Sequence, residues 1–134
     1  MKKIVTIPDY ERMMSRKYYA LLKAKMPEIV EYFFLELNDA QLLDQTEISK
    51  DVVTMNSKVL LKELKRRRKL EVMITYPEEA NDQERKVSVF SPIGTALLGR
   101  TVGDHVSWKI QGGQAEFEIL DITYQPEAVG DFDL

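Results

Sequence analysis

The amino-acid sequence predicts an α+β fold, in which a short antiparallel helical hairpin (coiled coil) precedes an antiparallel β-sheet domain with one short helix. Three observations lead to this prediction. Apolar residues recur every three or four positions in the first third of the chain, whereas they alternate with polar residues from about residue 52 onward. Between the later strands, one proline-started segment has the pattern of a short helix. We expect residues 1–50 to form the hairpin and residues 51–134 to form the sheet domain.

The composition is that of a globular protein and excludes several other classes. The 134 residues suffice for one ordinary domain, or for one small domain with an appendage. Apolar residues make up 44% and charged residues 31%, as in typical globular chains. The chain has no cysteine, which excludes disulfides and thiolate metal sites. Neither a signal peptide nor an apolar run of about 20 residues is present, so we expect a cytoplasmic protein without a membrane partner.

Two helices are expected in the first 50 residues. The first covers residues 10–25, where apolar side chains recur at helical spacing, and Pro8 and Asp9 suit its start. The second covers residues 27–43. Only a tight turn separates the two helices, so we expect them to pair antiparallel. At 1.5 Å per residue, the resulting hairpin would be about 25 Å long.

Charge and apolar patterning indicate how this hairpin is held. Residues 2–25 contain seven basic and two acidic residues, whereas residues 28–47 contain six acidic residues and no basic one. We expect these opposite charges to help hold the two helices in register. The run Tyr32–Phe34 makes the second helix apolar on more than one side. One face should therefore pack on the first helix and another on the sheet domain or a partner; alternatively, both helices simply pack on the sheet.

The turn between the two helices carries the residues of the hairpin tip. Glu28 and Glu31 lie one helical turn apart, and two carboxylates so placed could share a Mg²⁺ ion. We favour the alternative, in which they compensate the dipole at the start of the second helix. No cofactor or metal is therefore expected. The tip as a whole consists of Lys25, Met26, Pro27, Glu28 and Glu31.

Strand patterns begin after residue 51. Residues 52–59 are rich in β-branched side chains and are interrupted at Asn56-Ser57, as at a bulge or a sharp bend. Residues 70–76 alternate between apolar and polar until Pro77 ends the strand. Between these strands, an expected hairpin loop holds five consecutive cations: Lys65, Arg66, Arg67, Arg68 and Lys69.

These five cations could contact nucleic acid or an acidic protein surface by pairing with phosphates or carboxylates. The alternative is a solvated turn whose charges discourage pairing at the sheet edge. The net charge of the chain is −3, which argues against a dedicated nucleic-acid-binding protein. We therefore expect any contact with nucleic acid to be weak or indirect.

Local turn signals are concentrated in residues 87–104. After a short alternating strand, Ser91 can cap a helix, Pro92 suits its first position and Gly99 suits its stop. Gly103-Asp104 then turns the chain toward the next strand. This segment contains no nucleophile or metal cluster, so the residues themselves indicate a scaffold.

The last two strands are expected at residues 106–110 and 115–124, joined by a turn at Gly112-Gly113. The apolar phase of the final strand slips between Ile119 and Leu120, and a bulge there would restore one buried face. His105, the single histidine, has no nucleophile near it in sequence, so we expect a residue at a strand edge rather than a catalytic one.

Residues 91–104 follow the pattern Ser-Pro-Ile-x-x-Ala-Leu-Leu-Gly-x-x-x-Gly-Asp, and the final strand reads Ile-x-x-Ile-x-Tyr from residue 119. Both resemble the C-terminal domain of the bacterial Gre transcription factors, which bind RNA polymerase. Residues 51–59 and 124–131 are similar to a branch of that family with a shortened coiled-coil arm. The resemblance implies an FKBP-like fold for residues 51–134 without prolyl isomerase activity. It also implies docking beside the secondary channel of RNA polymerase through Phe90, Ser91, Pro92 and Ile93.

The same resemblance bears on catalysis. Gre factors that stimulate transcript cleavage carry an Asp-x-x-Glu pair at the tip of a much longer arm, where it brings Mg²⁺ to the polymerase active site. The tip of this chain differs in sequence, and its arm is shorter. We therefore expect the protein to bind polymerase without stimulating cleavage and to compete with cleavage factors. We also expect it to be a monomer, or else a dimer. The alternatives are a cleavage-stimulating Gre factor and a direct regulator of a metabolic enzyme.

Overall fold

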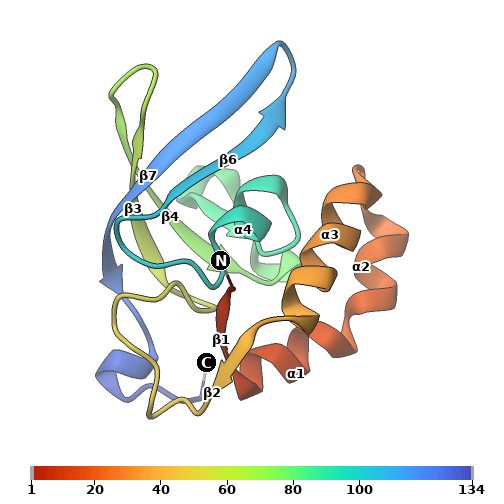
Figure 1. The fold of residues 1–134 in the computed structure, drawn as a ribbon, viewed down its shortest axis with the longest axis vertical. Helices are drawn as coiled ribbons and strands as arrows, with labels where there is room; N and C mark the ends of the chain where they lie inside the picture. Colours follow the sequence, from red (N-terminus) through yellow and green to blue (C-terminus); the bar gives the residue numbers. More distant parts are fainter. Residues whose placement is uncertain (1, 134) are drawn as a thin grey trace.

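The computed structural model describes residues 2–133, and its central element is a curled five-stranded sheet (Figure 1). The strand order is β5-β4-β3-β7-β6, and antiparallel pairs predominate. The α+β class is therefore confirmed, whereas the FKBP-like assignment stays a prediction. The strands of this sheet are β3 (Lys58–Glu63), β4 (Lys69–Thr75), β5 (Lys86–Ser88), β6 (His105–Ile110) and β7 (Gly113–Tyr124).

The expectation of a purely antiparallel sheet is wrong at one edge, because β5 pairs with β4 in parallel. The chain between them makes two 3-10 turns, η1 (Pro77–Glu79) and η2 (Asp82–Glu84). These turns carry the chain back past the end of β4, so that β5 starts in the same direction. A third 3-10 turn, η3 (Glu127–Val129), follows the last strand.

The predicted bulge in the final strand is confirmed. Leu60 pairs with Asp121 and Leu61 pairs with Ile119, which leaves Leu120 as the extra residue. The expected strand over residues 52–59 is wrong for residues 52–57, since β3 begins only at Lys58, but the expected interruption at Asn56-Ser57 is confirmed. Asn56 has a φ of 64°, a left-handed turn conformation that interrupts the extended chain there.

The N-terminal segment forms a helical layer beside this sheet, together with a small second sheet (Figure 1). The expected single helix over residues 10–25 is wrong: the chain bends at Arg16, whose N–H bonds the Met13 carbonyl, and two helices result. The helical elements of the molecule are α1 (Ile7–Ser15), α2 (Lys17–Lys23), α3 (Pro27–Asn38) and α4 (Pro92–Leu97).

The second expected helix is also shorter than residues 27–43, because α3 ends at Asn38. Residues Gln41–Leu43 instead form β2, which pairs in parallel with β1 (Ile4–Thr6). Pairing with β1 thus overrides the helical spacing at this end. At 1.5 Å per residue, the twelve residues of α3 span about 18 Å. Within residues 2–133, no helix is long and apolar enough to cross a membrane.

One buried cluster joins the helical layer to the sheet. α3 contributes Phe33, Phe34 and Leu37, and the sheet contributes Leu61 and Ile119, all fully buried. α3 lies between α2 and the body of the protein, with α4 on its other side (Figure 1). The division of the chain at residue 50 stays a prediction, since buried residues on both sides of it belong to this cluster.

The charges of the N-terminal helices are directed mainly at the body of the protein. Arg16 forms two 2.8 Å bonds to Glu78, and Glu36 pairs with Arg100 at 2.9 Å. Asp9, which is 5% exposed, accepts a 3.1 Å bond from the backbone N–H of Met55. These ion pairs join the helices to the body, and the idea that opposite charges hold the two helices in register with each other stays a prediction.

Candidate functional site

Local hydrogen bonds build α4 as its sequence predicts. The Ser91 hydroxyl accepts a bond from the Gly94 N–H at 3.2 Å and donates to the Ser88 carbonyl at 2.6 Å. A side chain at position 94 would collide with the backbone, because a Cβ there would lie 2.0 Å from the Ser88 oxygen. Gly99 ends the segment with a φ of +80°. The predicted cap, proline start and glycine stop are thus confirmed.

The turn after α4 is closed by Asp104. Its carboxylate accepts a 2.9 Å bond from the Thr101 N–H and a 3.2 Å bond from the Thr101 hydroxyl. His105 then begins β6 at the surface, 3.9 Å from Glu118. The predicted roles of Asp104 as a turn residue and of His105 as a strand-edge residue are confirmed.

A buried lysine, which the sequence analysis missed, joins the N-terminus to α4. Lys3 is 1% exposed, and its Nζ donates to the carbonyls of Thr95 at 2.8 Å and Leu98 at 2.6 Å. These are carbonyls at the end of α4, where a cation is favourable. Burial lowers the pKa of Lys3 to about 7, although the carboxylate of Glu36 opposes this change. The only signal for this buried cation in the sequence is that Lys3 directly precedes the short strand Ile4–Thr6.

The predicted docking residues are all half-buried, but their contacts differ. Phe90 is half-buried, and its ring stacks on Phe34 with a centroid distance of 5.7 Å. Ser91 is occupied in capping α4, whereas Pro92 and Ile93 have apolar side chains that are half-buried. Pro92 and Ile93 can therefore offer an apolar surface without loss of a side-chain hydrogen bond.

A groove brings the predicted docking residues and the hairpin tip together. This tip groove has a volume of about 740 Å³ and a mainly apolar wall. Its position between two sites far apart in sequence was not foreseen. It is lined by Lys23, Lys25 and Met26 from the hairpin and by Phe90, Ser91 and Pro92 from the sheet domain, among other residues.

One wall of the tip groove is fixed by a salt bridge. Arg16 bonds Glu78 through both of its terminal nitrogens, and this hydrogen bonding lowers the pKa of Glu78 to about 2. The guanidinium group also lies over the Tyr76 ring, 4.0 Å from its centroid. The Arg16 side chain, at the bend between α1 and α2, is thus held by two residues from the sheet side, Glu78 and Tyr76.

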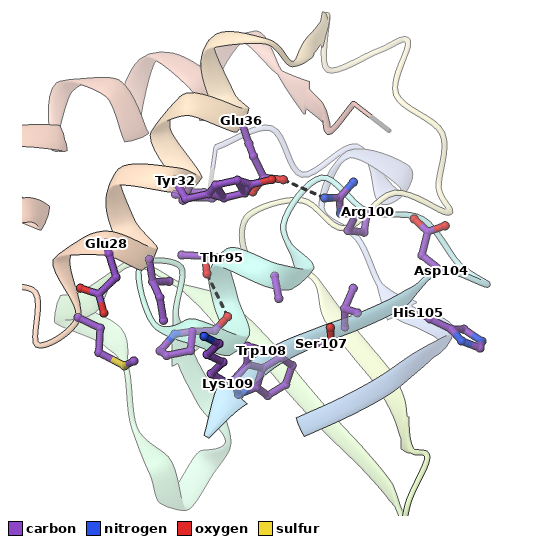
Figure 2. A pocket seen from close by; sticks show the side chains of 16 residues that line it. Glu28, Tyr32, Glu36, Thr95, Arg100, Asp104, His105, Ser107, Trp108 and Lys109 are labelled. Carbon is purple, nitrogen blue, oxygen red and sulfur yellow. Dashed lines mark hydrogen bonds and ion pairs between the residues drawn. The ribbon is translucent and has the colours of Figure 1, made fainter. Parts of the chain in front are cut away.

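A second groove lies between α3, α4 and β6 (Figure 2). This strand groove has a volume of about 940 Å³, and Figure 2 shows Glu28, Tyr32, Trp108 and Lys109 along it. The Trp108 ring stacks on Phe117 at 5.2 Å. The bond from Arg100 to Glu36 joins α3 to the segment after α4 at this groove. Pro92 and Met26 line both grooves, so the hairpin tip lies where they meet.

The two tip carboxylates have different surroundings. Glu28 lines the strand groove, whereas Glu31 is exposed and lines neither groove. In the part of the chain that the structure describes, no group of three or more His, Asp or Glu side chains is placed to hold a metal ion. The basic run 65–69 covers the β3–β4 loop and the first residue of β4, and it also lines neither groove.

Comparison with known proteins shows which protein family shares this sequence and architecture. Residues 48–124 match the family model "Transcription elongation factor, GreA/GreB, C-term". The "Regulator of nucleoside diphosphate kinase" of Escherichia coli K12 is 42% identical over 98 residues, which are 72% of each chain. The GreA factor of Chloroherpeton thalassium is 41% identical over 86 residues, and the match covers 64% of this chain but only 54% of that one. The chain thus matches about half the length of this GreA relative.

Solved structures extend the likeness to the N-terminal segment. A GreA/GreB transcription elongation factor from Nitrosomonas europaea has a TM-score of 0.74 and 30% identity, and the match covers 92% of this chain and 99% of that one. Gfh1 of Thermus thermophilus matches with a TM-score of 0.50 and 26% identity over 92% of this chain and 100% of the other. The chain therefore belongs to the GreA/GreB family of transcription elongation factors and is similar in particular to the regulator of nucleoside diphosphate kinase.

Proposed function

We propose that this Gre-family transcription regulator binds RNA polymerase at its secondary channel without catalysing a reaction, and that it competes there with the transcript-cleavage Gre factors. Relatives named as transcription elongation factors support the general role. Two features of the molecule support the more specific one: the tip groove as a docking surface, and the position of the hairpin tip.

The tip groove has the composition of a protein-docking surface. Phe90, Pro92 and Met26 supply apolar walls, and Lys23 and Lys25 add two exposed cations. Apolar contacts at the centre of an interface contribute most of the affinity, while charges at its rim mainly set orientation and association rate. We expect the polymerase segment in this groove to present an apolar side chain flanked by acidic residues.

The observation that carries the non-catalytic assignment is the position of the tip. Met26, at the turn of the hairpin, lines the same grooves as Pro92 of the docking edge. A carboxylate pair that serves a distant catalytic metal must extend well beyond the surface that docks. Here Glu28 lies beside that surface, and α3 spans only about 18 Å. The tip would therefore stay at the docking surface, short of the polymerase active site.

Binding to purified core polymerase tests the docking surface. We expect a stable complex with the unmodified protein, and a loss of about tenfold in affinity for Lys25→Glu, because the variant reverses a charge at the groove. Lys50→Glu makes the same charge change at an exposed lysine that lines neither groove. It should leave binding unchanged.

Two results would overturn this assignment. Equal loss of affinity in Lys25→Glu and Lys50→Glu would show that net charge, rather than the groove, controls binding. Binding to nucleoside diphosphate kinase, with none to core polymerase, would favour a direct action on that enzyme, which the name of the Escherichia coli relative suggests. The remaining alternative, a cleavage-stimulating factor, requires Glu28 and Glu31 to act on a backtracked complex.

A further inference from the structure

The β3–β4 loop concentrates positive charge in an otherwise acidic molecule. Residues 65–69 are all exposed cations and contribute +5, whereas the net charge of the chain is −3. The rest of the chain therefore carries −8. A polyanion that approaches this protein would be attracted by the loop and repelled by the rest of the molecule. It would therefore bind at the end of the molecule that carries the loop.

Hydrogen bonds attach the loop to the neighbouring hairpin. The Leu64 N–H donates to the Glu116 carbonyl at 3.0 Å, and the Lys65 ammonium donates to the Gln114 carbonyl at 3.2 Å. The β3–β4 and β6–β7 hairpins extend from the same end of the sheet (Figure 1). The hairpin that presents the cations is thus joined to a second hairpin, which lowers the entropy lost on binding.

A single carboxylate orients two of the arginines. Glu63 Oε1 lies 3.4 Å from Arg68 and 3.9 Å from Arg66, and these guanidinium side chains are 65% and 71% exposed. One negative charge therefore faces two guanidinium groups, each of which has further N–H donors besides those near Glu63. The charge of the loop with Glu63 included is still +4.

The chemistry of the run favours phosphate over an acidic protein surface. Guanidinium forks match phosphate oxygens in bidentate pairs. Protein interfaces, by contrast, are built around apolar and aromatic side chains and are poor in lysine, and residues 65–69 include no apolar side chain. We propose that residues 65–69 form a sequence-independent nucleic-acid-binding loop that contacts the phosphate backbone. The loop lies outside both grooves, so this proposal does not rest on the docking proposal.

Salt-dependent binding of labelled oligonucleotides tests the proposal with the full chain. Fluorescence anisotropy would be measured with a 20-nucleotide RNA, the same sequence as single-stranded DNA, and a 20-base-pair duplex, which separate the possible sources of the phosphates. With about four phosphates neutralised on a single strand, log affinity should fall with log salt at a slope of about −3. The triple variant R66A/R67A/R68A should reduce that slope by about 2 and weaken binding at least about tenfold at low salt.

Two further variants make the test specific. K2A/K50A/K58A removes the same number of charges from exposed lysines that lie outside the loop and line neither groove, and should change the affinity less than about twofold. Glu63→Gln removes the carboxylate that faces Arg66 and Arg68, so binding should become several-fold tighter. Unfolding curves of all variants check that each is folded.

The proposal is overturned if R66A/R67A/R68A keeps the parental salt slope, or if the control triple variant loses as much affinity. It is also overturned if poly-glutamate of equal charge competes as well as RNA does, since the partner would then be an acidic protein surface. Core polymerase free of nucleic acid should bind R66A/R67A/R68A normally. This last measurement separates failure of the loop proposal from failure of the docking proposal.

Discussion

The N-terminal region, residues 2–43, and the sheet region, residues 58–124, are held in place by different kinds of contact. In the sheet region, polar side chains bond backbone groups a few positions away, as Ser91 bonds Gly94 and Asp104 bonds Thr101. In the N-terminal region, two buried charged groups reach across the chain: Lys3 to the carbonyl of Leu98, and Asp9 to the N–H of Met55. Contacts between residues close together in the sequence thus hold the turns of the sheet region, whereas buried charges with distant partners hold the N-terminal region against the sheet.

The largest effect is expected at Lys3. Lys3→Ala removes a buried cation, leaves the carbonyls of Thr95 and Leu98 without the lysine donor, and leaves Glu36 with Arg100 but without its second cation. Loss of one partner from such a buried set costs about 4 kcal/mol. Urea unfolding should show this loss, whereas Lys2→Ala, at an exposed pair with Asp39, should cost less than about 0.5 kcal/mol. Equal effects at the two positions would mean that Lys3 does not hold the N-terminal region.

The matching change in the sheet region is Gly94→Ala. Its Cβ would lie 2.0 Å from the Ser88 oxygen, so the cap of α4 must move, at a cost of about 3 kcal/mol. Gly103→Ala is the control: its φ is +95°, but nothing lies within 4 Å of the added Cβ. Only backbone strain remains there, about 1 kcal/mol. A smaller effect at Gly94 than at Gly103 would contradict the tight local packing of this turn.

The pH dependence of stability separates the two regions further. Burial raises the pKa of Asp9 to about 6 from its ordinary value of 3.8. Between about pH 4 and pH 6, the folded chain therefore keeps a proton that the unfolded chain has released, and stability falls as pH rises. The decrease should be about 2 kcal/mol. Asp9→Asn, which can still accept the bond from Met55, should lack this decrease; an unchanged pH profile would exclude Asp9 as its source.

The smallest effect is expected where the hairpin meets η1 at the surface. Glu78→Gln breaks the charged pair with Arg16, but the Glu78 side chain is 58% exposed and water replaces its partner. The variant should lose about 0.5 kcal/mol of unfolding free energy in low salt and less in high salt. A loss comparable to that of Lys3→Ala would mean that exposed charges also hold the N-terminal region.

The sequence predicted the sheet region well because its signals are local. The cap at Ser91, the stop at Gly99, the turn at Asp104 and the bulge at Leu120 each depend on residues close together in the chain. The exception is β5, whose parallel pairing depends on the path of the polar loop before it.

The N-terminal region was predicted less well because distant contacts determine it. Pairing of β1 with β2 ends α3 at Asn38, and the contacts of Arg16 with Glu78 and Tyr76 accompany the break after α1. Both features override helical spacing that extends further in the sequence. The candidate site residues stay predictions, and the groove that joins the tip to Pro92 depends on this packing and could not be foreseen.

Transcript cleavage in a backtracked polymerase complex tests the central claim most directly. We expect the purified protein to leave the cleavage rate at that of polymerase alone, and to slow cleavage when a cleavage-stimulating Gre factor is added with it. Lys25→Glu should compete less strongly, because it weakens docking in the tip groove. Cleavage stimulated by this protein, and abolished by Glu28→Ala together with Glu31→Ala, would contradict the account and make it a catalytic accessory factor.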